Sequence, residues 1–106
     1  MDFNIVFIVL PDVYQVNKDL MRIKAKYYGI EYDMLDMLAP NRILENDFRN
    51  HQIQFFDTTD CLMKNERLDL LYYTQDNHFT KYGHEAVAEC IEEQGFYSIV
   101  NSLSRR

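Results

Sequence analysis

The stretch FNIVFIVLPD, residues 3–12, decides the fold class of this chain. Residues 3–10 are rich in β-branched and aromatic side chains, and Pro11 ends the run. A continuous apolar run of this kind suits a strand that is covered on both faces, as in a parallel sheet. The sequence therefore predicts a buried parallel strand over residues 3–10 and an α/β fold around it.

A helix is expected directly after this strand. Asp12 is placed to cap the helix, and Gln15, three residues later, completes a capping-box pattern. The apolar residues that follow share one helical face, because their spacings match the helical period. These residues are Val16, Leu20, Ile23 and Tyr27. Gly29 is a natural C-terminal stop for the helix.

Residues 40–57 predict a second helix and a second strand. Pro40 suits the first turn of a helix. The residues expected to face the core from this helix are Ile43, Leu44 and Phe48. Residues 53–56 are predicted to form a short strand that Asp57 closes. Since a strand, two helices and a strand in this order favour a parallel crossover, we expect a small parallel sheet flanked by helices.

The C-terminal part of the chain predicts mainly helices. A short helix is expected to end at Met63, followed by a charged loop over residues 64–69. Thr80 is expected to start a longer helix, which Gly95 separates from a last amphipathic segment. The expected inner face of the longer helix consists of Tyr82, Ala86, Val87, Cys90 and Ile91.

The length and composition allow one small domain, residues 1–106. Apolar residues make up 47% of the chain and charged residues 26%, which is ordinary for a globular protein and excludes a disordered one. Only two convincing strands are predicted. Two strands leave unpaired sheet edges, and such edges favour association with another chain.

The charge and hydropathy patterns exclude two classes of partner. The formal net charge is −6, whereas phosphate binding needs a basic stripe, so nucleic acid is a poor partner. The apolar run over residues 3–10 is too short for a membrane span and lacks the basic flank of a signal peptide. Nothing in the sequence indicates a compartment.

The two cysteines, Cys61 and Cys90, lie far apart and form no C-x-x-C pair. Metal ribbons and thioredoxin chemistry need closer pairs, so neither is expected. Cys90 lies on the predicted apolar helix face, which is typical of a buried structural thiol. A disulfide between the two cysteines is the open alternative.

The segment LYYTQDNHFTKYGH, residues 71–84, carries the residues best suited to chemistry. Asp76 and His78 are two positions apart, so in an extended loop they project to the same side. The aspartate can then accept a hydrogen bond from an imidazole N–H and stabilise the imidazolium, as a catalytic base requires of its orienting carboxylate. Thr80 would cap the following helix and hold the loop.

Two other interpretations of this pair stay open. Asp76 and His78 can pair for local order alone, because short Asp-x-His spacings also occur by chance. They can also join His84 as metal ligands, but the spacing is not that of a helical pair and no fourth ligand is evident. We therefore expect neither a metal nor a cofactor. His51 is expected at an exposed helix end.

Residues 71–91 resemble the C-terminal block of the SGNH (GDSL-type) esterase and acetyltransferase superfamily. That block has an Asp and a His a few residues apart, then a polar helix start, a Gly and often a His. The matching residues are Tyr72, Tyr73, Asp76, His78, Phe79, Thr80, Gly83 and His84. The single residue between the Asp and the His resembles the branch of bacterial polysaccharide O-acetyltransferases, such as those acting on alginate. A weaker likeness extends over residues 3–94.

The resemblance implies that the chain is the C-terminal part of a flavodoxin-like, three-layer SGNH domain. His78 would be the general base and Asp76 would orient it, in ester hydrolysis or acyl transfer on carbohydrate O-acetyl groups. The family's nucleophilic serine, in a Gly-Asp-Ser block, and its oxyanion-hole Gly and Asn have no counterpart here. The serines of the chain are Ser98, Ser102 and Ser104.

Three hypotheses about function follow. In the first, the chain needs an N-terminal half as its partner for activity on a carbohydrate ester. In the second, it is a non-catalytic α/β domain that forms homo-oligomers through its strand edge or binds another partner. The third is an unrelated small α/β binding domain such as a receiver. A receiver, however, needs an acidic pair after its first strand and a phosphoacceptor Asp after its third, which two strands do not supply.

Overall fold

The two predicted strands form a parallel pair in the computed structural model, which describes residues 5–104. β1 (Val6–Val9) lies beside β2 (Gln54–Asp57), and the described part of the chain contains no further strand in this sheet. Residues 3–4 of the predicted first strand lie outside the described residues. The prediction of a small parallel sheet is confirmed.

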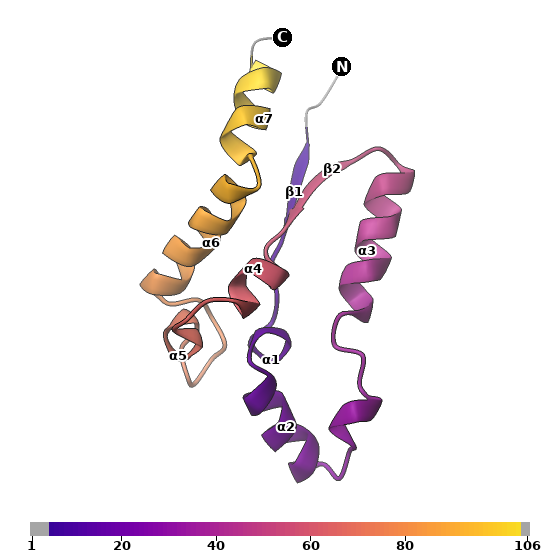
Figure 1. Cartoon of the computed structure of the whole chain (residues 1–106), viewed down its shortest axis with the longest axis vertical. Helices are drawn as coiled ribbons and strands as arrows, with labels where there is room; N and C mark the ends of the chain where they lie inside the picture. Colours follow the sequence, from indigo (N-terminus) through magenta and orange to yellow (C-terminus); the bar gives the residue numbers. More distant parts are fainter. Residues whose placement is uncertain (1–4, 105–106) are drawn as a thin grey trace.

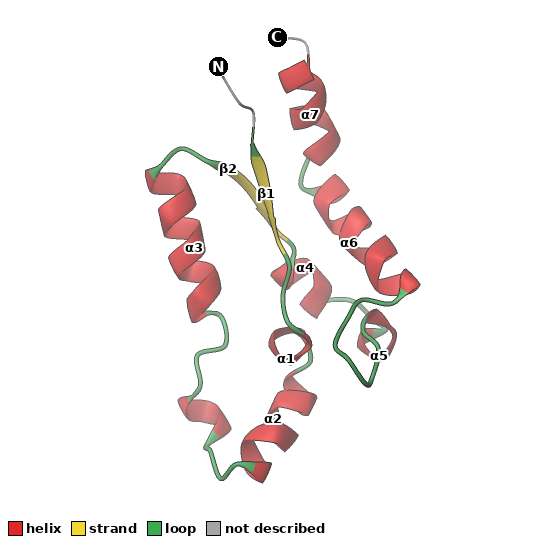
Figure 2. Ribbon diagram, turned by 180° about the vertical axis from the view of Figure 1, so that it is seen from behind, coloured by secondary structure: helices red, strands yellow, loops and turns green. Residues whose placement is uncertain are grey.

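Helices flank this sheet on both sides (Figures 1 and 2). They are α1 (Val13–Val16), α2 (Lys18–Tyr27), α3 (Ala39–Asn50), α4 (Thr59–Met63), α5 (Leu68–Leu71), α6 (Lys81–Glu93) and α7 (Phe96–Ser104), with a 3-10 turn over Tyr32–Met34. Phe7 and Phe55 are opposite each other in the sheet, and both rings approach Phe48 of α3, at 5.0 and 5.2 Å between centroids. Elsewhere, Phe56 of β2 contacts Phe96 of α7 at 5.6 Å. The α/β class is therefore confirmed, while the flavodoxin-like assignment stays a prediction.

The capping box predicted after β1 is present. The Asp12 carboxylate caps the first turn, and the Gln15 side-chain oxygen accepts the Asp12 N–H. The helix then stops early, because Asn17 adopts an extended backbone with φ −104° and ψ 96°. The Asn17 side chain accepts the Leu20 N–H and so caps a new helix, α2. The single helix predicted after β1 is therefore two helices, α1 and α2.

The apolar face predicted to run from Val16 to Tyr27 is wrong beyond its first member. Val16 is buried, but Leu20 and Ile23 are exposed and Tyr27 is 83% exposed. Ala25 is the buried residue of α2. Because the chain leaves helical geometry between α1 and α2, the second helix does not continue the buried face of the first.

α3 turns a different face inward from the one its apolar pattern predicts. Phe48 contacts the sheet as expected, but Ile43 and Leu44 are exposed, so the prediction for these two residues is wrong. The buried residue of α3 is Asn41, whose amide donates to the Asp57 carboxylate at 3.0 Å. A polar side chain that keeps its hydrogen bonds can occupy a buried helix position in place of an apolar one.

The core lies beyond the carboxyl ends of the strands, among α1, α4, α5 and α6. Its buried residues are Val13, Val16, Leu62, Leu71, Tyr72, Ala86 and Cys90. A disulfide joins Cys61 of α4 to Cys90 of α6. Cys90 is buried as expected, but its expected free thiol is wrong, and the disulfide is the alternative that is present. The crosslink encloses residues 62–89 and limits how far α4 and α6 can separate.

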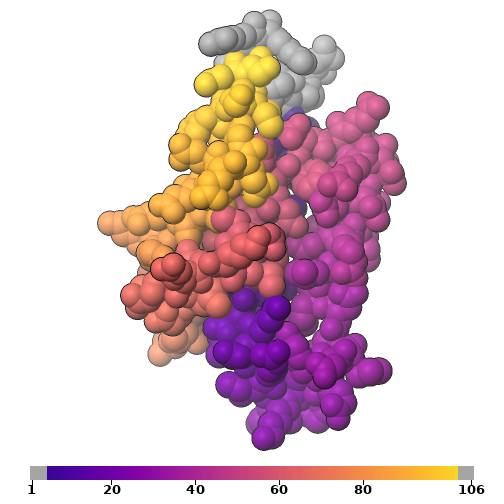
Figure 3. All heavy atoms as spheres, viewed as in Figure 1, coloured from indigo at the N-terminus to yellow at the C-terminus, as the bar shows by residue number. Residues whose placement is uncertain are grey.

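β1 keeps an open edge. Among the described residues it pairs only with β2, and four apolar side chains in and beside it are exposed: Ile5, Phe7, Ile8 and Leu10. The radius of gyration is 16.0 Å, against about 13 Å for a compact domain of this length. In Figure 3 the C-terminal helices and the segment that contains α3 form two separate columns. The expectation of a strand buried on both faces is therefore only partly met.

α6 approaches α5 so closely that position 83 requires glycine. A Cβ atom built on Gly83 would lie 2.0 Å from the Leu71 carbonyl oxygen. Gly83 is buried in the inner face of α6, whereas Tyr82, which was expected there, is exposed and its hydroxyl donates to Asn65. The predicted placement of Tyr82 is therefore wrong. α5 itself occupies the end of a segment that was expected to be a loop.

We expect Gly83→Ala to lower the free energy of unfolding by about 2 kcal/mol, because the backbone oxygen of Leu71 must move to admit a methyl group. Urea denaturation followed by circular dichroism measures this change. Glu85→Ala, an exposed substitution on the same helix, is the control and should stay within about 0.5 kcal/mol of the wild type. Equal stability of the two variants would contradict the close approach of α6 to α5.

Candidate active site

The loop between α5 and α6 carries Asp76 and His78, and it is closed at its base. Tyr72 and Phe79 form an isolated antiparallel bridge, and their rings stack with centroids 4.5 Å apart. The Tyr73 N–H donates to the His78 carbonyl oxygen at 2.8 Å. The loop is therefore a closed turn that is held at both ends.

Tyr72 ties this loop to the carboxyl end of β1. Its hydroxyl donates to the Pro11 carbonyl oxygen at 2.8 Å, in a buried contact between residues 61 positions apart. Burial, together with the negative charge of Asp12, raises the pKa of the Tyr72 phenol, which therefore remains a hydrogen-bond donor at neutral pH. Ligands of open α/β sheets bind outside the carboxyl ends of the strands. The loop is thus attached where a ligand site is expected.

Thr80 joins the loop to α6. Its hydroxyl accepts the Gly83 N–H at 3.0 Å and donates to the Leu70 carbonyl oxygen. Its own N–H donates to the Leu71 carbonyl oxygen at 3.0 Å. The predicted helix cap at Thr80 is confirmed, and it fixes the position of the loop relative to α5 and α6.

The structure brings Asp76 and His78 together. Asp76 Oδ1 lies 3.5 Å from His78 Nδ1 and accepts the His78 backbone N–H at 3.1 Å. Both side chains are exposed to solvent, at 58% for Asp76 and 83% for His78. Asn77 between them has a left-handed backbone, with φ 60°. The expected extended geometry is therefore wrong, and a tight turn at Asn77 makes the contact.

The hydrogen bond from the His78 N–H is the main cause that lowers the pKa of the Asp76 carboxyl. Desolvation opposes this effect, and the imidazole of His78 adds to it. Asp76 is therefore ionised at neutral pH. Because its carboxylate faces Nδ1 of His78, Nε2 is the ring nitrogen that remains to accept a proton. This arrangement can orient an imidazole and stabilise its protonated form, as a general base requires.

No serine side chain that the structure describes lies at this pair. Ser98 and Ser102 belong to α7, and α6 lies between α7 and the loop (Figure 1). Ser104 ends the same helix. The fold therefore does not replace the missing Gly-Asp-Ser block with a serine from elsewhere in the described chain.

A buried polar network at the end of β2 is a feature that sequence reasoning missed. Asn41 donates to Asp57 at 3.0 Å and to the Thr59 hydroxyl at 2.8 Å. Gln15 donates to Asn41 at 2.9 Å and to the Met37 carbonyl oxygen at 2.8 Å. These bonds hold α1, α3 and β2 in one arrangement. The network is structural, because within the described residues no buried side-chain polar atom lacks a partner.

The other two histidines lie apart from this chemistry. His84 is in the first turn of α6, and its ring centroid is 5.8 Å from that of Phe79. His51 ends α3, and its Nδ1 lies 2.8 Å from the Asp47 carbonyl oxygen. Within residues 5–104, no three His, Cys, Asp or Glu side chains are grouped to hold a metal ion.

Comparisons with protein-family models, curated proteins and solved structures gave no match. Among the helices of residues 5–104, none is both long and apolar enough to cross a membrane. The interpretation of the site therefore depends on the geometry of the loop and on the motif in the sequence.

We expect the Asp76 carboxyl to titrate with a midpoint below 3.8, its ordinary value, because the His78 N–H stabilises the carboxylate. Because the pKa of Asp76 is lowered, the contact stabilises the fold fully at pH values above the ordinary pKa. This stabilisation is lost as the pH falls through the lowered pKa. The chemical shift of the His78 backbone amide, followed by NMR between about pH 2 and pH 6, reports this step.

Asp76→Asn is the control for this titration and should remove the acid transition from the His78 amide. A transition that persists in Asp76→Asn, or a wild-type midpoint at or above 3.8, would contradict the hydrogen bond that the structure places between the two residues.

Proposed function

We propose that this chain carries the Asp–His part of an SGNH-type serine esterase or O-acyltransferase site. The observation that supports the proposal best is the contact of Asp76 Oδ1 with His78 Nδ1, at 3.5 Å, on a turn that is closed by the Tyr72–Phe79 bridge. Nδ1 of the imidazole faces the carboxylate, so Nε2 is the nitrogen that remains for proton transfer.

The position of the turn also supports this function. The Tyr72–Pro11 hydrogen bond attaches it to the carboxyl end of β1, the edge at which parallel sheets bind ligands. The exposure of His78 supports the same conclusion, because a base that serves a substrate or a nucleophile must be reachable.

In the proposed reaction, His78 Nε2 accepts the proton of a serine hydroxyl while the serine oxygen forms a bond to the ester carbonyl carbon. The proton then passes to the leaving alkoxide, which departs as an alcohol. Water or an acceptor hydroxyl then attacks the acyl-serine, and His78 takes the proton of this nucleophile. The proton passes to the serine oxygen as the acyl group leaves it. Asp76 keeps the imidazole oriented and stabilises its positive charge throughout.

The serine and the oxyanion-hole donors come, in this proposal, from a segment outside this sequence. The chain has no Gly-Asp-Ser block, and the described serine side chains lie on α7, which α6 separates from the turn. Carbohydrate O-acetyl esters are the proposed substrates because of the resemblance to polysaccharide O-acetyltransferases, not because of any single contact.

We expect the isolated chain to hydrolyse p-nitrophenyl acetate no faster than its His78→Ala variant does. When the chain is joined to the polypeptide encoded directly upstream of Met1, we expect turnover that falls about 10³- to 10⁴-fold in His78→Ala and in Asp76→Asn. Initial rates measured at saturating ester report both effects.

His51→Ala is the matched control, since it removes a histidine at the end of α3, and it should keep full activity. Turnover of the joined form that His78→Ala leaves unchanged would overturn the proposed base. Robust turnover by the isolated chain that His78→Ala abolishes would instead show that the nucleophile lies within these residues.

The open edge of β1 supports a second candidate function, that of a non-catalytic domain that associates through this strand. Edge strands of stable monomers usually carry charges or are covered, whereas β1 is apolar throughout. A second copy, or a strand from a partner segment, would pair the free backbone groups of β1 and cover Ile5, Phe7, Ile8 and Leu10.

We expect the chain to form dimers or larger assemblies at about 100 μM, and Ile8→Lys to shift it to the monomer, because a lysine on an edge strand opposes pairing. Size-exclusion chromatography with light scattering measures the mass. Ile43→Lys introduces the same charge at an exposed position of α3 and should leave the assembly intact. A well-folded wild-type monomer would contradict association through β1.

A further inference from the structure

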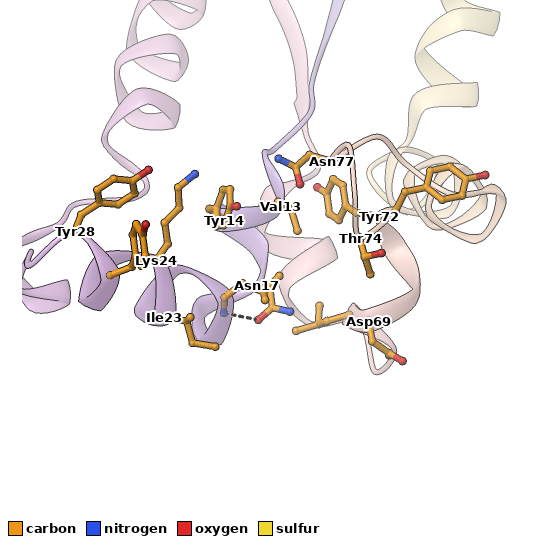
Figure 4. Close-up of a pocket in the computed structure, with 14 residues that line it drawn as sticks. Val13, Tyr14, Asn17, Ile23, Lys24, Tyr28, Asp69, Tyr72, Thr74 and Asn77 are labelled. Carbon is orange, nitrogen blue, oxygen red and sulfur yellow. Dashed lines mark hydrogen bonds between the residues drawn. The ribbon is translucent and has the colours of Figure 1, made fainter.

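A groove of about 540 Å³ runs beside the Asp76–His78 turn (Figure 4). One wall is formed by α1, α2 and the residue that follows α2, and it contributes Tyr14, Lys24 and Tyr28. The other wall is formed by α5 and the turn, which contribute Asp69 and Asn77 among others. The volume lies within the range of about 300 to 1,000 Å³ that is typical of small-ligand sites. Asn77, which sits between Asp76 and His78 in the chain, is one of the lining residues.

Tyrosines dominate the aromatic surface of this groove. Its aromatic residues are Tyr14, Tyr27, Tyr28, Tyr72 and Tyr73. A tyrosine offers a flat apolar face and a hydroxyl at its edge, so it suits a ligand that is itself apolar on its faces and polar around its rim. A sugar ring has this character, since its axial C–H groups stack on aromatic faces and its hydroxyls form hydrogen bonds.

Uncharged hydrogen-bonding groups lie among the tyrosines. Asn17, Thr74 and Asn77 supply amide and hydroxyl groups from both walls. Asn17 Oδ1 accepts the Leu20 N–H, so the amide nitrogen of Asn17 remains to donate to a ligand. The groove also has apolar lining residues, which are Val13, Leu20, Ile23 and Leu68. An acyl chain bound against them would leave the polar groups on both walls without a partner.

The charge of the groove is close to neutral. Its charged lining residues are one cation, Lys24, and one anion, Asp69. The Lys24 ammonium lies 4.0 Å from the Tyr14 ring centroid, which satisfies part of its charge within the protein. The chain as a whole carries −6, so its field repels polyanions and does not steer them into the groove.

We propose that this groove binds an uncharged carbohydrate chain, with a sugar ring against Tyr28 and hydroxyls on Asn17, Thr74 and Asn77. Uronate polymers are disfavoured as ligands by the negative charge of the protein. The role of the groove as the substrate subsite rests on the proposed function. The binding of the sugar does not depend on catalysis.

The test is an NMR titration of the isotope-labelled chain with four uncharged hexasaccharides, built from glucose, mannose, xylose and N-acetylglucosamine. We expect at least one to give saturable shifts of the Asn17 and Asn77 side-chain amides with a dissociation constant of about 1 mM. Hexagalacturonate should bind at least about tenfold more weakly, because of its charge. Tyr28→Ala should weaken binding about three- to tenfold, through the loss of one stacking face.

Tyr97→Ala is the matched control, because Tyr97 of α7 is 61% exposed and Tyr28 is 64% exposed. It should leave binding unchanged. The proposal is overturned if none of the four sugars shifts these amides at about 10 mM, if Tyr28→Ala and Tyr97→Ala bind equally, or if decanoate binds more tightly than every sugar and so identifies an acyl-chain site. The titration measures binding and not turnover, so sugar binding together with turnover of the joined form that His78→Ala leaves unchanged would contradict the proposed function alone.

Discussion

The hydrogen bond from the Tyr72 hydroxyl to the Pro11 carbonyl oxygen is the contact on which the candidate site depends. It joins the end of the first strand to a loop 61 residues away, and it is buried. A buried carbonyl oxygen without a partner costs about 1–3 kcal/mol, so both groups favour this one arrangement. The stacked Phe79 ring and the Thr80 cap then determine where the rest of the turn lies. Asp76 and His78 depend on this attachment for their place at the carboxyl end of β1.

Two further constraints hold the elements around this contact. The Asn41 network joins α1, α3 and β2 through hydrogen bonds, and the Cys61–Cys90 disulfide joins α4 to α6. The segment enclosed by the disulfide includes the whole turn with Asp76 and His78, so the crosslink limits the separation of the elements that carry it. In contrast, β1 pairs with β2 alone among the described residues, and Phe7 and Ile8 in it are exposed. The end of the fold that carries the candidate chemistry is thus well connected, while the strand edge is open to another chain.

Local sequence patterns predicted where the helices and strands lie better than they predicted which face of each is buried. The apolar run of β1, the capping box at Asp12 and the cap at Thr80 are interactions between near neighbours, and all three are present. The exposed Ile43 and the buried Asn41 of α3 reverse the pattern, because the partner of Asn41 is Asp57 on a different element. Periodicity identifies an apolar face, but it does not indicate whether another element reaches that face.

The sequence by itself determined that the chain is α/β and that its two strands run parallel, and it singled out Asp76 and His78 as candidates for acid–base chemistry. These conclusions follow from side-chain periodicity and from spacing, which act over a few residues. Only the tertiary structure decided how the pair meets, through the left-handed turn at Asn77, and that Leu20, Ile23 and Tyr27 face a groove instead of the core. It also decided that the cysteines form a disulfide. These outcomes depend on contacts between residues far apart in the chain, which no local pattern encodes.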